Sequence, residues 1–135
     1  MKFVIVDDEE INLVITKKLL QHILGAVDIL TFTDGGEALT YFSNNFDYNV
    51  WPQVNLFLDL NMPIVSGWDF LDFFRELKDE IKSRVNIYIL TSSIDPIDKR
   101  RALTNSNVIA CFSKPLTPGL IREYFGENRS IALLR

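Results

Sequence analysis

The sequence predicts an α/β domain in which helices cover both faces of a parallel β-sheet. Short apolar runs alternate along the chain with longer stretches whose apolar residues recur at helical spacing. The short runs are mostly apolar, which is typical of strands buried on both faces. A strict alternation of strands and helices favours parallel strands joined by right-handed crossovers. A chain of 135 residues is long enough to bury one such core.

Five apolar runs predict the strands of the sheet. The third run leads directly into Asp59 and then into a turn with Pro63 and Gly67. Five strands in one domain favour the order 2-1-3-4-5, the doubly wound (βα)5 flavodoxin-like three-layer sandwich. We expect one domain over residues 1–126 and a C-terminal tail over residues 127–135. The predicted strands are residues 3–6, 27–32, 55–58, 85–90 and 108–112.

A helix is predicted after each strand. The first helix carries apolar residues near helical spacing and ends at Gly25. Ser66 begins the third helix as a cap, and Phe70, Phe73 and Phe74 are predicted to face the core. The apolar residues of the first helix are Ile11, Val14, Ile15, Leu19 and Ile23. The caps predicted for the other helices are Asp34, Asp95 and Thr117.

Composition argues against several functional classes. The net charge of −4 argues against nucleic acid and membrane surfaces as partners, because both are anionic. The single cysteine, Cys111, excludes a disulfide framework within the chain and a thiolate metal cluster. No secretory signal pattern and no apolar run of about 18 residues occur. We therefore expect a soluble, cytoplasmic protein.

Polar residues stand where the predicted strands end. Asp7 and Asp8 follow the first strand, Asp59 the third, Thr91 the fourth and Lys114 the fifth. Because parallel strands end at one edge of the sheet, we expect these side chains to converge there. Three neighbouring carboxylates repel one another unless a cation offsets them, and all-oxygen ligation of this kind suits Mg²⁺.

The same set of residues fits phosphoryl transfer. A carboxylate can act as the nucleophile and form an aspartyl phosphate. A lysine and a hydroxyl can stabilise the charge on the phosphoryl oxygens, and Lys114 and Thr91 supply these groups. The sequence therefore predicts metal-assisted phosphorylation of Asp59.

Four motifs at the strand ends resemble those of the receiver domain of two-component response regulators, and the resemblance covers nearly the whole chain. It implies that Asp59 is the phosphoacceptor and that Asp7, Asp8, Asp59 and the backbone carbonyl of Asn61 hold Mg²⁺. The motifs are Val-Asp-Asp-Glu at 6–9, Leu-Asp-Leu-Asn-Met-Pro at 58–63 followed by Gly67, Leu-Thr-Ser at 90–92 and Ser-Lys-Pro at 113–115.

The resemblance also implies roles for the remaining site residues. Thr91 would bond the phosphoryl group and move on phosphorylation, and Lys114 would pair with that group. The peptide bond before Pro115 is commonly cis in such proteins. Asn61 and Ser93 flank the site and are expected to tune hydrolysis of the phosphoryl group.

The resemblance implies the partners as well. A histidine kinase or histidine phosphotransfer protein would donate the phosphoryl group to a stand-alone, single-domain switch that is not itself an enzyme. Output would be binding to another protein through the face formed by residues 95–125. The chain departs from the family pattern at Cys111, where receivers usually carry Tyr or Phe. Phe112 is adjacent, but strand alternation directs it to the opposite face of the sheet.

Two alternatives remain open from the sequence. A phosphorylation-independent interaction domain would keep the fold alone, and Cys111 gives this alternative some weight. A phosphatase of the haloacid-dehalogenase type also uses an Asp nucleophile with Thr, Lys and Mg²⁺. That class needs a second Asp two residues later as the general acid, and here the position is Asn61. His22 on the first helix has no ligand partner nearby in the sequence and is predicted to be structural or solvated.

Overall fold

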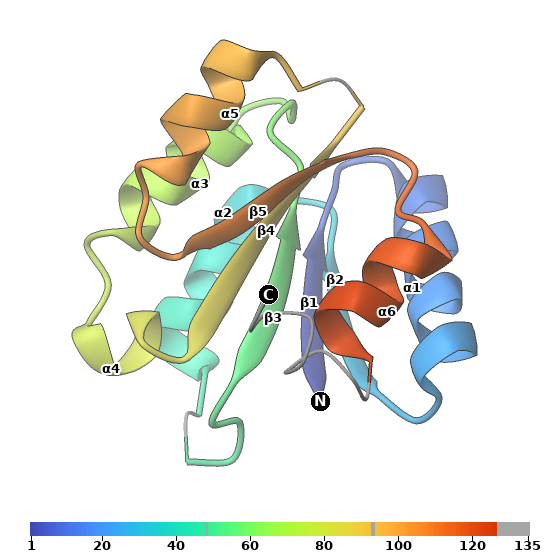
Figure 1. The fold of residues 1–135 in the computed structure, drawn as a ribbon. Helices are drawn as coiled ribbons and strands as arrows, with labels where there is room; N and C mark the ends of the chain where they lie inside the picture. Colours follow the sequence, from blue (N-terminus) through green and yellow to red (C-terminus); the bar gives the residue numbers. More distant parts are fainter. Residues whose placement is uncertain (48, 93, 127–135) are drawn as a thin grey trace.

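The protein forms a five-stranded parallel sheet with the strand order β2-β1-β3-β4-β5 (Figure 1). A computed structural model describes residues 1–47, 49–92 and 94–126. The predicted fold class and strand order are therefore confirmed, whereas Ser93 and the predicted tail lie outside the described residues. The strands are β1 (Lys2–Val6), β2 (Asp28–Phe32), β3 (Val54–Leu58), β4 (Val85–Thr91) and β5 (Val108–Ser113).

Helices fill the connections, and one of them was not predicted. Helix α4 is four residues long and buries a single side chain, Ile81, so it has too little periodicity to be recognised in the sequence. Ser66 and Asp69 form the capping box of α3, as the sequence predicted. The helices are α1 (Glu10–Leu24), α2 (Gly35–Thr40), the π-helix η1 (Tyr41–Asn45), α3 (Gly67–Phe74), α4 (Asp79–Lys82), α5 (Pro96–Leu103) and α6 (Pro118–Phe125).

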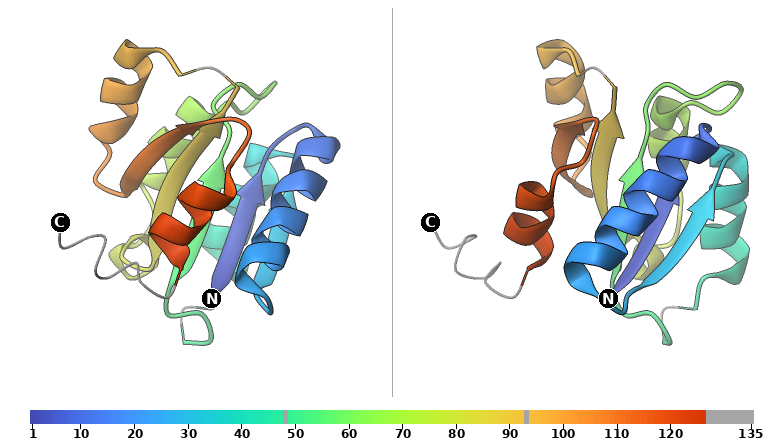
Figure 2. Two further views of the ribbon diagram at one scale, coloured as in Figure 1. Left: turned by 45° about the vertical axis from the view of Figure 1, so that its right-hand side comes forward. Right: turned by 90° about the vertical axis from the view of Figure 1, so that its right-hand side faces the viewer.

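The sheet separates two layers of helices, as Figures 1 and 2 show, and an apolar cluster fills the space on each of its faces. Helices α2, α3 and α5 cover one face, and α1 and α6 cover the other. Alternate residues of each strand enter alternate layers. Phe112 belongs to the layer under α1 and α6, whereas Cys111 packs against the opposite layer, as predicted. Within the described part of the chain, no helix has the length and apolar character needed to cross a bilayer.

Two predictions of buried residues are wrong. Phe73 was predicted in the core, but 59% of its surface is exposed, because α3 buries only the stripe that contains Phe70 and Phe74. Helix α1 packs only Leu19 and Ile23 of the predicted apolar set against the core, and both are half-buried. Its buried residues are Leu13, Thr16 and Leu20. Its exposed apolar residues are Ile11 (67%), Val14 (49%) and Ile15 (52%).

The strand register brings the predicted site residues to one edge. Val6 of β1 pairs with Leu58 of β3, so Asp7 and Asp59 follow paired residues. The backbone N–H of Asp59 donates to the carbonyl of Val6 at 3.0 Å, which extends this register by one residue. On the other side Thr91 of β4 pairs with Ser113 of β5, immediately before Lys114.

Candidate functional site: an acidic cluster at the carboxyl edge of the sheet

The carboxylate of Asp59 is buried and held by three hydrogen bonds. Its Oδ1 accepts from the hydroxyl of Thr91 at 3.1 Å and from the backbone N–H of Asn61 at 3.2 Å. Its Oδ2 accepts from the ammonium of Lys114 at 3.0 Å. Asp59 is 5% exposed and Thr91 is fully buried. These contacts fix the orientation of a carboxylate that can act as an oxygen nucleophile.

Lys114 bridges two carboxylates across the sheet. Its Nζ lies 2.6 Å from Asp7 Oδ2 and 3.0 Å from Asp59 Oδ2. Burial acts to lower the pKa of Lys114, but the hydrogen bonds to Asp7 and Asp59 outweigh it and raise this pKa above its ordinary value. The backbone N–H of Lys114 also donates to the carbonyl of Thr91 at 2.7 Å. Lys114 is therefore a fixed ammonium at the centre of the site.

Asp7, Asp8 and Asp59 form the acidic part of the cluster. Each offers a carboxylate oxygen within 4.8 Å of the others. Burial raises the pKa of Asp7 above its ordinary value, and the neighbouring Asp59 acts in the same direction, although Lys114 and the N–H of Glu9 oppose it. The pKa of Asp7 therefore rises chiefly through burial, whereas that of Lys114 rises because two carboxylates accept hydrogen bonds from its ammonium.

This cluster fits a hard divalent cation. Three carboxylates and one ammonium leave a formal charge of −2 at pH 7. All side-chain donors of the cluster are oxygens, which are the ligands that Mg²⁺ and Mn²⁺ prefer over thiolate or imidazole. The predicted carbonyl ligand belongs to Asn61, whose N–H already bonds Asp59, so this residue lies at the cluster. Its side-chain Nδ2 also lies 3.4 Å from Thr91 Oγ1.

The turn after β3 brings α3 directly against the backbone of Asp59. The N–H of Gly67 donates to the carbonyl of Leu60 at 2.9 Å. A Cβ atom at position 67 would lie 2.3 Å from the carbonyl oxygen of Asp59 and 2.6 Å from Leu60 Cα. Only glycine allows this approach, which explains why Gly67 is part of the motif around Asp59.

Two further features lie in β5 and directly after it. The peptide bond between Lys114 and Pro115 is cis, as the resemblance implied. Cys111 is half-buried beside α5, and burial raises the pKa of its thiol, although Lys99 of α5 partly opposes this rise. His22 is exposed on α1 and is not part of the site.

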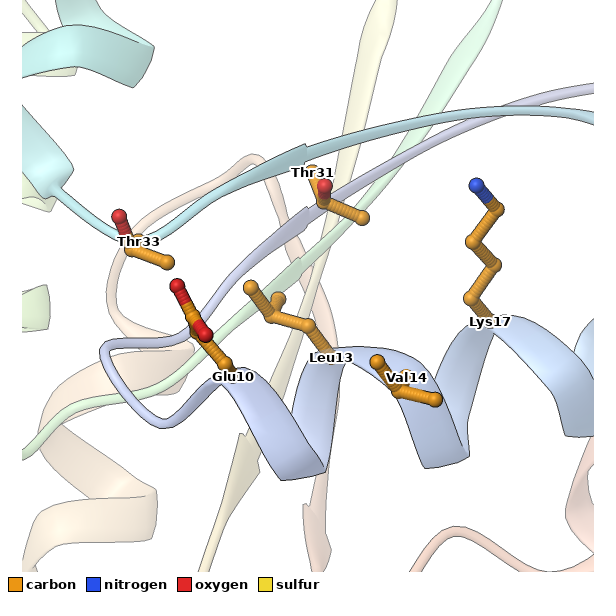
Figure 3. Close-up of a pocket in the computed structure, with 6 residues that line it drawn as sticks. All are labelled: Glu10, Leu13, Val14, Lys17, Thr31 and Thr33. Carbon is orange, nitrogen blue, oxygen red and sulfur yellow. The ribbon is translucent and has the colours of Figure 1, made fainter.

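Sequence reasoning missed the groove that connects α1 to the site. Ile15 and Leu19 of α1 line it on one side, and Lys114, Pro115 and Leu116 line it on the other. The signal was present in the sequence, because α1 has more apolar residues than one stripe can bury. A second hollow, between α1 and β2, contains none of the clustered carboxylates (Figure 3).

Comparison with known proteins decides the family. Residues 3–125 match the family model of the response regulator receiver domain. The chain belongs to this family. Receiver domains are signalling domains, and the position of the acidic cluster at the carboxyl edge of the sheet agrees with the expectation from the sequence.

Individual relatives agree with this assignment. Over 137 aligned residues, the receiver domain is 28% identical to hybrid signal transduction histidine kinase I of Dictyostelium discoideum; the match covers 96% of this chain and 8% of the kinase. The chain therefore spans only a small part of that relative. The crystal structure of a response regulator receiver protein from Dyadobacter fermentans matches with a TM-score of 0.79 and 26% identity, covering 93% of this chain and 98% of that one.

A two-component response regulator from Cytophaga hutchinsonii has the same fold. Its crystal structure matches with a TM-score of 0.83 and 24% identity, covering 99% of this chain and 97% of the other. The resemblance stated from four short motifs is therefore confirmed over the whole described domain.

Proposed function

We propose that this receiver domain is a phosphorylation switch whose phosphoacceptor is Asp59. The observation that carries the proposal is the carboxylate of Asp59 held between the Thr91 hydroxyl and the Lys114 ammonium. The donor is a histidine kinase or a histidine phosphotransfer protein, and the match to a hybrid histidine kinase supports a donor of this class. The domain reacts only slowly by itself and has no catalytic turnover of an external substrate.

In the proposed step one carboxylate oxygen of Asp59 forms a bond to phosphorus. The bond between phosphorus and the donor's imidazole nitrogen breaks, and its electron pair stays on the nitrogen. Lys114 and Thr91 then donate hydrogen bonds to phosphoryl oxygens instead of to the free carboxylate. Loss of the negative charge on one Asp59 oxygen and gain of the phosphoryl charge pull both donors toward the new group.

Asp7, Asp8, Asp59 and the carbonyl of Asn61 would hold Mg²⁺ in this switch. The ion supplies charge neutralisation for the phosphoryl oxygens. Support comes from the three clustered carboxylates and their uncompensated charge of −2. Asp7 is oriented for this role by its own turn, in which the N–H of Glu9 donates to Asp7 Oδ1 at 2.9 Å.

A protein donor would contact the exposed apolar side of α1. Ile15 is 52% exposed and lines the groove that also contains Lys114, so this surface continues into the site. Val14 lies on the other side of the helix, where it lines the hollow next to β2 (Figure 3). An apolar surface beside the phosphoacceptor fits a protein that carries its phosphohistidine on a helix of matching character.

Output would pass through residues 95–125, which include α5, β5 and α6. Thr91 is the last residue of β4, and the next helix in the chain is α5. The hydroxyl of Thr91 would move toward the phosphoryl group. A shift of Thr91 would therefore change the position of α5 in a pre-existing equilibrium. Ile97 of α5 and Ile109 of β5 are exposed on this face and available to a partner protein.

Incubation with acetyl phosphate and Mg²⁺, followed by intact mass measurement, tests the proposal. We expect one phosphoryl adduct on the wild type and none on Asp59→Asn. Glu37→Gln, an exposed acid outside the cluster, is the control and should keep the adduct. Absence of an Mg²⁺-dependent adduct on the wild type would favour the interaction domain. Steady turnover of p-nitrophenyl phosphate would instead favour the phosphatase.

A further inference from the structure

Helix α5 is attached to the domain by very few buried side chains. Ala102 is the only residue of Pro96–Leu103 that is buried, and its other residues, including the apolar Ile97 and Leu103, are exposed or half-buried. A helix held by one small apolar residue can shift at low free-energy cost. Any additional contact on α5 therefore has a large effect on where the helix rests.

One such contact joins α5 to α3. The guanidinium of Arg101 lies over the indole ring of Trp68, 4.0 Å from the ring centroid. Trp68 is the second residue of α3 and is half-buried against the same apolar layer as Cys111. A cation placed over the face of a tryptophan is the most favourable geometry of this interaction.

The tryptophan end of this contact is fixed to the backbone of Asp59. The neighbouring Gly67 donates its N–H to the carbonyl of Leu60, and any side chain at this position would clash with the carbonyl of Asp59. The capping box between Ser66 and Asp69 holds the first turn of α3 on both sides of Trp68. Trp68 thus lies in a helical turn that is anchored to the end of β3 and not to α5.

The arginine end belongs to the element that follows Thr91. The chain leaves β4 at Thr91 and enters α5 at Pro96, so α5 is the helix that a displacement of Thr91 would reach along the backbone. The aromatic ring that receivers usually have on β5 is absent, because Cys111 occupies that position. The contact between Arg101 and Trp68 therefore joins α5, which follows Thr91, to α3, which is anchored beside Asp59.

We propose that the Arg101–Trp68 contact is a clamp that holds α5 in its resting position and is released when Asp59 is phosphorylated. The release on phosphorylation rests on the proposed function, whereas the holding of α5 does not. The strength of an exposed cation–π contact corresponds to about a two- to fivefold bias between the held and released positions. Because the coupling is reciprocal, loss of the clamp favours phosphorylation by the same factor.

Hydrogen exchange of the unphosphorylated protein tests the holding role. We expect Arg101→Gln to speed exchange of the α5 amides about two- to fivefold. Arg100→Gln removes the same charge from the same helix and should leave α5 unchanged. Arg101→Lys keeps the charge but not the planar group, so the exchange rate of its α5 amides should lie between those of Arg101→Gln and Arg100→Gln. Equal exchange in Arg101→Gln and Arg100→Gln would overturn the clamp.

Tryptophan fluorescence tests the release. The chain has two tryptophans, so Trp51→Phe leaves Trp68 as the single reporter. In this background acetyl phosphate and Mg²⁺ should change the emission of Trp68, and Arg101→Gln should abolish the change. The acetyl phosphate concentration at half-maximal phosphorylation should fall about two- to fivefold in Arg101→Gln.

Intact mass separates the two possible failures. A phosphoryl adduct on Asp59 without any change in Trp68 emission would overturn the release. If no adduct forms, the proposed function is wrong and so is the release, while the holding role is decided by the exchange rates alone.

Discussion

The ammonium of Lys114 lies 2.6 Å from Asp7 Oδ2, closer than its 3.0 Å distance to Asp59 Oδ2. The lysine that is expected to bind the phosphoryl group is therefore also bonded to a carboxylate expected to bind the metal. The same ammonium would serve the phosphoryl group and offset the charge of Asp7. We therefore expect occupancy of the metal site to be linked to the position of Lys114.

Replacing Lys114 with methionine should make this linkage measurable. The change removes the one positive charge from the cluster, so we expect Mg²⁺ to bind about five- to tenfold more tightly. Phosphorylation by acetyl phosphate should slow at the same time, since a donor to the phosphoryl oxygens is lost. Calorimetric titration with Mg²⁺ measures the first effect. Weaker Mg²⁺ binding by Lys114→Met would contradict the linkage, and Lys99→Met on α5 is the matched control.

The approach of Gly67 to Asp59 predicts a strong effect of one methyl group. Gly67→Ala would place a Cβ 2.3 Å from the carbonyl oxygen of Asp59 and 2.6 Å from Leu60 Cα, and both of these atoms are backbone and cannot rotate away. We expect the free energy of unfolding to fall by about 2–3 kcal/mol, with slower phosphorylation because the turn after Asp59 must shift. Urea denaturation provides the measurement.

Gly119→Ala is the control for this substitution. Gly119 lies in α6, and an added Cβ there would meet only Thr117 Oγ1, at 3.9 Å. Alanine favours a helix over glycine, so the free energy of unfolding should rise by up to about 1 kcal/mol. Equal behaviour of the two variants would mean that the contact at Asp59 is easily relaxed.

Cys111 should react slowly with alkylating reagents at neutral pH. Burial raises the pKa of its thiol above the ordinary value of 9.0, so the thiolate forms only at higher pH in the folded protein. The rate of reaction with iodoacetamide, followed against pH, should show a midpoint above that of the urea-unfolded chain. Lys99→Gln should move it higher, because Lys99 lowers this pKa.

The same shift fixes the sign of a stability effect. The folded state favours the protonated thiol, so this contribution is complete below the thiol pKa of the unfolded chain. It is lost as the pH rises through the higher pKa of the folded protein. Cys111→Ala should therefore remove part of the loss of stability above about pH 9. An identical alkaline profile in wild type and variant would contradict a buried thiol.

The apolar surface of α1 predicts a difference between large and small phosphodonors. Ile15→Ser should slow phosphorylation about tenfold with a histidine-phosphorylated protein that phosphorylates the wild type, since a buried apolar contact contributes about 1.5 kcal/mol or more. Acetyl phosphate needs no such surface and should act at an unchanged rate. Ile97→Ser on α5, with similar exposure, is the control for surface polarity. Equal slowing with both donors would mean that Ile15 supports the folded structure and does not bind the protein donor.

The sequence predicted the sheet and the members of the site because both depend on strand ends. Each site residue follows an apolar run, and parallel pairing places the carboxyl ends of all strands at the same edge of the sheet. These residues are Asp7, Asp59, Thr91 and Lys114. The helix faces were harder to predict. In α1 two sets of apolar residues interleave, and only the packing against β1 and α6 decides that Leu13 is buried and Ile15 is not.

Contacts across the helical layer could not be predicted at all. Arg101 and Trp68 are far apart in the sequence, and neither position has a pattern that points to the other. The exposure of Phe73 could not be predicted for the same reason, because it depends on the rotation of α3 against the sheet. Helix rotation and side-chain pairing are tertiary properties that local propensity does not determine.

All five strands run in the same direction, so the amino edge of the sheet carries none of the clustered carboxylates (Figure 1). There Lys2 lies with its ammonium 4.3 Å from the ring centroid of Trp51, and Met1 is 55% exposed. A label, tether or fused reporter attached at Met1 would thus sit a full strand length from the acidic cluster. The molecule can be fixed to a sensor surface at this end, on the edge of the sheet opposite the proposed phosphorylation site.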